Sequence, residues 1–150
     1  MQLTRAADYG VRAMVYLAGL PTGRRAGIAE LAKAAEVSPV FLTKVLKRLT
    51  MAGLMVSYRG AGGGFALSAP ASDISLLDVV EAIEGPVQLN LCTGACATPV
   101  AACHRQTWCA VSSVWMHAQA KLREALVQAS LDSLARESAR RLEAMRAAEF

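Results

Sequence analysis

The chain has 150 residues, 54% of them hydrophobic, which allows one ordinary domain or a small domain plus an oligomerisation element. It contains no uncharged apolar run of about 18 residues and no apolar signal core, so we expect a cytoplasmic protein rather than a membrane-spanning or secreted one. Residues 1–70 carry nine Lys/Arg and three Asp/Glu, a net charge of +6, whereas residues 71–150 carry seven Lys/Arg and nine Asp/Glu, a net charge of −2. The basic half suits a polyanion such as DNA, although a solvated surface would show the same excess of positive charge.

Three helices are predicted in the basic half. The first covers residues 5–20, where Thr4 is a good N-cap and the expected buried stripe consists of Ala7, Val11, Met14, Val15 and Ala18. The second covers residues 28–35. The third follows Ser38 and Pro39, an N-cap and a residue suited to the first helical position, and runs to about Ala52. Its inward stripe consists of Leu42, Val45, Leu46 and Leu49, and its outward face of Val40, Thr43, Lys44, Lys47 and Arg48. This pair of helices is typical of a helix-turn-helix.

A glycine-rich hairpin is predicted next. Strand-like runs at 55–59 and 65–68 flank the sequence Gly-Ala-Gly-Gly-Gly at 60–64, which indicates a two-stranded wing whose tip can approach another molecule closely. A phosphate-binding nucleotide loop is the alternative. The glycine spacing is not G-x-G-x-x-G, however, and no Gly-Lys-Ser/Thr occurs in the chain.

Three further helices are expected in the C-terminal half. One begins at Ser75, which forms a capping-box-like pair with Asp78, and ends near Gly85. A long amphipathic helix follows residue 109, and a last helix starts near Ser130. Because a complete winged module leaves these two helices little to cover, we expect them to pack against a second copy. The predicted fold is mainly α, with residues 1–85 as a winged helix-turn-helix module, 86–109 as a cysteine-rich cluster-binding loop, and 110–150 as a dimerisation helix and a C-terminal helix.

All four cysteines lie in one short stretch with the spacing C-x3-C-x6-C-x5-C: Cys92, Cys96, Cys103 and Cys109. Thiolates suit iron–sulfur clusters, zinc or copper(I), and only the first gap fits a compact zinc knuckle. A metal-free thiol switch and inert packing are the alternatives. His104 could add a ligand, although a solvent-facing loop histidine is the simpler interpretation, and we expect Trp108 and Trp115 to be packing anchors. A redox enzyme is a weaker hypothesis, because the chain has no C-x2-C pair, nucleotide motif or nucleophile set.

Short motifs occur in order along nearly the whole chain: 1–4, 8–10, 12–13, 37–38 with Leu42, Tyr58-Arg59-Gly60, 62–64, 78–83, the cysteine loop, and Cys109-x5-Trp115. They resemble the family of bacterial winged-helix iron–sulfur repressors that includes the cluster regulator IscR and the nitric-oxide sensor NsrR. The resemblance implies a homodimeric transcriptional regulator, not an enzyme, that binds a near-palindromic operator with one recognition helix in each major groove and each wing at a minor groove. The DNA-binding residues are then expected to be Ser38, Val40, Thr43, Lys44, Lys47, Arg48, Tyr58, Arg59, Gly62 and Gly63.

The resemblance also implies a 2Fe–2S or 4Fe–4S cluster that senses nitric oxide, redox or iron status, with thiol oxidation as the cluster-free alternative. Three cysteines of one subunit would hold it, and two of them are Cys103 and Cys109. The first cysteine of the family pattern corresponds either to Cys92, which lies at the matching distance from the 81–83 helix, or to Cys96, whose spacing to Cys103 is closer to the usual one. In IscR-like proteins the fourth ligand is a histidine three positions after the last cysteine, where this chain has Ser112. In some NsrR-like proteins it is an acidic residue in the first helix of the partner subunit, a position that Asp8 occupies. The resemblance is therefore NsrR-like more than IscR-like.

Overall fold

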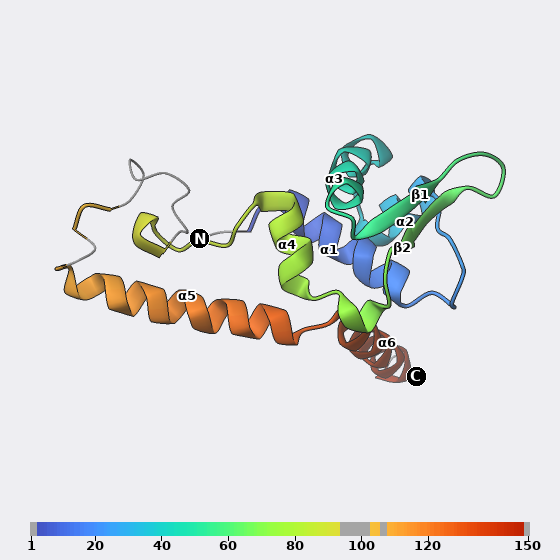
Figure 1. Cartoon of the computed structure of the whole chain (residues 1–150). Helices are drawn as coiled ribbons and strands as arrows, with labels where there is room; N and C mark the ends of the chain where they lie inside the picture. The colour runs from blue at the N-terminus through green and yellow to red at the C-terminus, as the bar shows by residue number, and fades with distance from the viewer. Residues whose placement is uncertain (1–2, 94–102, 106–107, 149–150) are drawn as a thin grey trace.

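The computed structural model describes residues 3–93, 103–105 and 108–148, so Cys96 lies outside the described residues. Its two-stranded hairpin projects from one side of the helices (Figure 1), and this confirms the predicted mainly α winged-helix fold with a C-terminal helix. The elements follow in the order α1 (Arg5–Ala18), α2 (Ile28–Ala35), α3 (Pro39–Met51), β1 (Met55–Tyr58), β2 (Gly64–Leu67), η1 (Ala71–Asp73), α4 (Leu76–Glu84), η2 (Leu91–Thr93), α5 (Ala110–Gln128) and α6 (Leu131–Ala148). No helix in these described ranges combines the length and apolar character needed to cross a membrane.

The helix starts follow the local sequence signals. The side chains of Thr4 and Ser38 accept hydrogen bonds from backbone N–H groups of the first turns of α1 and α3, and Pro39 occupies the first position of α3. Ser75 and Asp78 form a complete capping box at the start of α4. The turn between α2 and α3 is tight because Glu36 adopts a left-handed conformation, with φ of 56°. The predicted inward stripe of α3 is confirmed, since all four of its residues are buried.

The buried face of α1 differs from the predicted one. Val11, Val15 and Ala18 are only partly buried, whereas Gly10, Ala13 and Leu17 join Ala7 and Met14 in the interior. Gly10 explains the difference, because a Cβ there would lie 2.3 Å from Cδ1 of Ile83 and 3.1 Å from Cγ1 of Val45. The absence of a side chain therefore lets α1 approach α3 and α4 closely, a packing device that hydrophobic periodicity does not reveal.

The wing has a third backbone partner from outside the hairpin. β1 and β2 pair antiparallel from Met55 opposite Leu67 to Tyr58 opposite Gly64. Ala26, in the loop between α1 and α2, then exchanges both backbone hydrogen bonds with Phe65, at 3.1 and 2.8 Å. The tip-proximal part of β2 is consequently held by the loop that precedes α2.

The two C-terminal helices have different partners. The C-terminal part of α5 contacts α4 (Figure 1), where Leu122 and Leu126 pack against a small cluster of Leu77, Val80 and Val87. α6 returns to α1: Leu131 is fully buried in the main core, and its backbone N–H donates to Ile74 O at 2.9 Å. The last helix thus covers part of its own winged module as well as presenting surface to solvent.

The expectation that Trp108 and Trp115 are packing anchors is wrong within this chain. Their exposed fractions are 70% and 40%, and the neighbouring Val111, Val114 and Met116 are also exposed. The N-terminal half of α5 therefore presents an apolar face to solvent.

Candidate DNA interface and cysteine segment

The outward face of α3 is exposed along its whole length. Val40 is 75% exposed, and Thr43, Lys44 and Lys47 are exposed beside it. Thr43 donates its hydroxyl hydrogen to Pro39 O at 2.8 Å, which fixes the side chain and leaves its methyl group and remaining lone pair for contacts. A short helix with two lysines around an apolar and hydroxyl patch can contact phosphates at its edges and base edges at its centre.

Arg48 has a contact that its position in the outward set did not suggest. Its Nη1 donates to Ile83 O, near the end of α4, at 2.7 Å. A guanidinium has five N–H donors, so this bond ties α3 to α4 and still leaves donors for a phosphate. The structure therefore shows Arg48 bridging α3 and α4, and its contact with DNA stays a prediction.

The wing turn requires its glycines. Gly60 and Gly62 have φ of 88° and 79°, and Gly63 N–H donates to Gly60 O at 2.9 Å. A Cβ at Gly63 would lie 2.4 Å from Tyr58 O and 2.9 Å from Gly60 O, contacts with backbone that cannot yield cheaply. The turn presents the exposed Arg59 at the start of the tip.

Arg25 is a residue of the candidate interface that the sequence analysis missed. Its guanidinium lies over the Tyr58 ring, 3.5 Å from the centroid, in a cation–π contact. Its neighbour Arg24 instead pairs with Glu30 at 2.8 Å, and Glu30 also accepts the Tyr16 hydroxyl at 2.6 Å, which raises the pKa of Tyr16. In the sequence, Arg24 and Arg25 contribute only to the positive charge of a loop. The pairing of the adjacent Ala26 with the wing, which brings Arg25 to Tyr58, leaves no periodic signal in the sequence.

Substitutions on α3 should separate phosphate contact from base reading. Lys47→Ala should weaken binding to all DNA sequences and flatten the salt dependence of log K by about one unit, because one phosphate contact is lost. Thr43→Ala should instead change the ranking of operator variants at fixed salt. Fluorescence anisotropy titrations at several salt concentrations measure both effects, and an equal loss of specific and non-specific binding in Thr43→Ala would contradict the base-reading role.

Gly63→Ala should lower operator affinity by about 1–3 kcal/mol, the value of a good groove contact, because the tip can no longer hold Arg59 in place. The helical core should stay folded, since the wing tip lies at the surface. Ala61→Ser, in the same tip, is the control and should bind normally. Similar affinities for both variants at one salt concentration would show that the turn geometry does not matter for binding.

Two of the described cysteines, Cys92 and Cys109, lie next to α5. Cys92 is buried in η2, which packs against α5, and Cys109 is the residue that precedes α5. Cys103 and Cys109 are half-buried, and Cys109 N–H donates to Arg105 O at 2.8 Å. His104 is exposed, as expected for a loop histidine, and Ser112 is buried in the first turn of α5.

The candidate cluster ligands fit in chemistry but are not gathered into one site. Thiolates such as those of Cys92, Cys103 and Cys109 are the soft donors that an iron–sulfur cluster takes. Within residues 3–93, 103–105 and 108–148, however, no three His, Cys, Asp or Glu side chains lie close enough together to hold a metal ion. Asp8 lies exposed on α1 and pairs with Arg12 at 3.0 Å, while Arg12 also reaches Glu36 at 3.3 Å. If a cluster binds, Cys92, Cys103 and Cys109 are the residues that would hold it.

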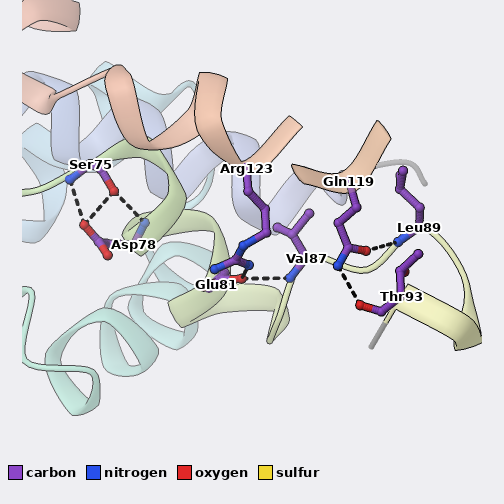
Figure 2. Close-up of polar contacts among 8 residues, drawn as sticks. All are labelled: Ser75, Asp78, Glu81, Val87, Leu89, Thr93, Gln119 and Arg123. Carbon is purple, nitrogen blue, oxygen red and sulfur yellow. Dashed lines mark hydrogen bonds and ion pairs between the residues drawn. The ribbon is translucent and has the colours of Figure 1, made fainter. Parts of the chain in front are cut away.

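A polar network holds residues 87–93, at the start of the cysteine-rich loop, to α4 and α5 (Figure 2). Glu81 Oε1 accepts the Val87 N–H at 3.0 Å and also pairs with the Arg123 guanidinium. The Gln119 side-chain amide accepts the Leu89 N–H at 3.0 Å and donates to Thr93 O at 2.7 Å. The sequence did not predict these contacts, although Glu81 lies in the motif 78–83, because the bonds made by Gln119 and Arg123 join residues that are distant along the chain.

A helix-turn-helix with a basic outer helix and a glycine-rich wing defines a DNA-binding transcriptional regulator of the winged-helix class, not an enzyme. Residues 3–137 match the model of the Rrf2 family, described as an iron-dependent transcriptional regulator, and the chain therefore belongs to this family.

Solved regulators share this fold. Staphylococcus aureus CymR in an oxidized form is 25% identical, with a TM-score of 0.67, over 90% of this chain and 96% of that one. CymR, the global cysteine regulator of B. subtilis, is 24% identical, with a TM-score of 0.70, over 91% and 98% of the two chains. IscR of T. potens is 23% identical, with a TM-score of 0.71, over 92% and 88%. At these identities the last two comparisons concern the fold alone.

Proposed function

We propose that the protein is a homodimeric repressor that binds a near-palindromic DNA operator. The observation that carries this proposal is the exposed outer face of α3 beside a wing whose glycine turn presents Arg59, both in the basic half of the chain. α3 enters the major groove, where Val40 and Thr43 face bases and Ser38, Lys44, Lys47 and the free donors of Arg48 approach phosphates. Tyr58, Arg59, Gly62 and Gly63 lie along the neighbouring minor groove.

The second subunit is part of this proposal because one helix-turn-helix reads only one half-site. Two recognition helices must be separated by about one helical turn of DNA to read a palindrome. The apolar face of α5 around Val111, Val114 and Trp115 supplies exposed surface for the second copy. The chain then has three functional parts with the boundaries expected from the sequence: DNA binding at 1–85, sensing at 86–109 and dimerisation at 110–150.

For the signal, we propose an NsrR-like iron–sulfur cluster held by Cys92, Cys103 and Cys109, with Asp8 of the partner subunit as the fourth ligand. The iron-dependent description of the family supports a metal, and the lack of a histidine at Ser112 favours the carboxylate over the IscR-like ligand. Such a cluster supplies a centre that reacts with nitric oxide and oxidants. In the described structure the carboxylate of Asp8 is exposed on α1 and pairs with Arg12, so binding to iron would replace this surface ion pair.

A cluster-free thiol switch is the second candidate. Cys103 and Cys109 are half-buried and lie six positions apart in the sequence before α5, and a similar regulator, Staphylococcus aureus CymR, has been solved in an oxidized form. If hydrogen peroxide oxidised the two thiols to a disulfide, it would take up their two electrons and two protons and be reduced to two molecules of water. The S–S bond formed would link the two ends of the segment that precedes α5.

The experiment combines a spectrum with DNA titration. Protein purified without oxygen should absorb visible light, and it should bind an operator selected from random duplexes with a steep salt dependence. Nitric oxide should bleach the spectrum and weaken the specific complex in parallel. Colourless protein whose specific binding responds to peroxide but not to iron, sulfide or nitric oxide would favour the thiol switch. No sequence preference in the selected DNA would contradict the operator proposal.

A further inference from the structure

We infer that Gln119, Glu81 and Arg123 are positioning residues that couple the segment carrying Cys92 to the recognition helix. The inference rests on the proposed function, in that it assumes that chemistry at the cysteines alters DNA binding. It does not depend on whether that chemistry is metal binding or thiol oxidation.

The first link joins Cys92 to α5. Gln119 uses both ends of one side-chain amide, accepting from Leu89 N at 3.0 Å and donating to Thr93 O at 2.7 Å (Figure 2). The two backbone groups bracket residues 90–92, and Thr93 also closes this turn by donating its hydroxyl to Asn90 O at 2.8 Å. Gln119 therefore holds the turn that carries Cys92 against α5, in addition to the packing of η2 on α5.

The second link joins α5 to α4. Arg123 lies four residues after Gln119, so both side chains leave the same face of the helix. Arg123 pairs with Glu81 of α4, and the same carboxylate oxygen accepts the Val87 N–H at 3.0 Å. These side chains are only partly exposed, and Leu122 and Leu126 pack beside them against Leu77 and Val80. If residues 87–93 are displaced while these contacts hold, Glu81, Arg123 or both must move with them.

The third link joins α4 to the DNA-binding helix. Ile83 follows Glu81 by two residues, and its carbonyl accepts the Arg48 guanidinium of α3 at 2.7 Å. The close approach of α1 at Gly10 holds the Ile83 side chain from the other side. Arg48 is adjacent to Lys47, so a shift of the end of α4 changes where α3 places its outward face. The path from Cys92 to α3 is thus continuous in packed or hydrogen-bonded contacts.

Spatial continuity alone does not establish coupling, so the test is a double-mutant cycle. Operator affinity is measured for wild type, Cys92→Ser, Arg123→Met and the double variant, all purified in the same way. We expect Cys92→Ser to change the dissociation constant at least about fivefold in wild type, the lower end of allosteric couplings, and less than about twofold when Arg123 is replaced. Gln119→Leu should reduce the Cys92 effect in the same way.

Two controls separate coupling from loss of structure. Arg123→Lys retains a cation for Glu81 and should restore most of the Cys92 effect. Arg136→Met removes an exposed arginine of α6 that pairs with Asp132, outside the network, and should leave the Cys92 effect intact. Hydrogen exchange should show faster exchange at the Leu89 amide in Gln119→Leu while the Val87 amide stays protected by Glu81.

The outcomes distinguish this inference from the proposed function. If Cys92→Ser changes affinity by the same factor in wild type, Arg123→Met and Gln119→Leu, the coupling role is overturned while the DNA-binding proposal stands. If wild type shows no operator preference, the proposed function is overturned, and the coupling inference that rests on it is overturned as well. If wild type binds but Cys92→Ser has no effect, Cys92 is not part of the signal and the inference is overturned with it.

Discussion

Replacing Leu131 by alanine should lower the free energy of unfolding by about 2–5 kcal/mol, the range for a fully buried leucine in a packed core. The Leu131 side chain is 0% exposed and lies in the same cluster as residues of α1. Its removal leaves a cavity that the rigid helices around it cannot fill. Urea denaturation followed by circular dichroism measures the change, and the slope should stay constant if only stability is altered.

Leu142→Ala is the matched control for this prediction. Leu142 belongs to the same helix but is 54% exposed, so its replacement should change stability by no more than about 0.5 kcal/mol. Equal losses in the two variants would mean that α6 does not pack on α1 in solution as it does here.

Replacing any one of Cys92, Cys103 or Cys109 by alanine should abolish the visible absorbance of protein purified without oxygen. Each supplies one of only three protein thiolates in the proposed ligand set, and too few soft donors then remain to retain a cluster. Asp8→Ala should keep the absorbance but reduce the effect of nitric oxide on DNA binding, because a carboxylate is the weakest of the four ligands. Anaerobic spectra and iron and sulfide determinations provide the measurement.

Two substitutions in the same loop serve as controls. His104→Ala should retain the spectrum, since His104 is exposed, and Cys96→Ala should be nearly silent if Cys92 is the first ligand. A coloured Cys92→Ala together with a colourless Cys96→Ala would exchange the roles of the two cysteines.

Local signals predicted the fold well. Ser38 followed by Pro39 indicated the start of α3, and the spacing of Leu42, Val45, Leu46 and Leu49 indicated its buried side, because capping and periodicity act over a few residues. The glycine run similarly predicted the wing turn. In the DNA-binding half, the sequence therefore indicated both the architecture and which face of α3 is exposed.

Contacts between distant parts of the chain could not be predicted in this way. Three sets of contacts join residues that are 26 to 39 positions apart. They are the Arg48 bond to Ile83 O, the bridge between Ala26 and Phe65, and the bonds of Gln119 to Leu89 and Thr93. A single sequence carries no periodic trace of such pairs. Gly10 was missed for a related reason: its role is to leave space, which a search for apolar side chains does not detect. The ligand set remains a proposal because it joins loop residues to a residue of another subunit.

The return of α6 to α1 also determines when the protein can finish folding during synthesis. Ser130 bridges Ser75, and Leu131 fills a core position among residues of α1 that emerge from the ribosome more than 100 residues earlier. At about 5–20 residues per second, the N-terminal helices wait several seconds for this partner, with part of their apolar surface uncovered. The helix-turn-helix therefore cannot reach its full stability as an early, independent unit, so nascent chains that stop before residue 131 should be sensitive to proteolysis.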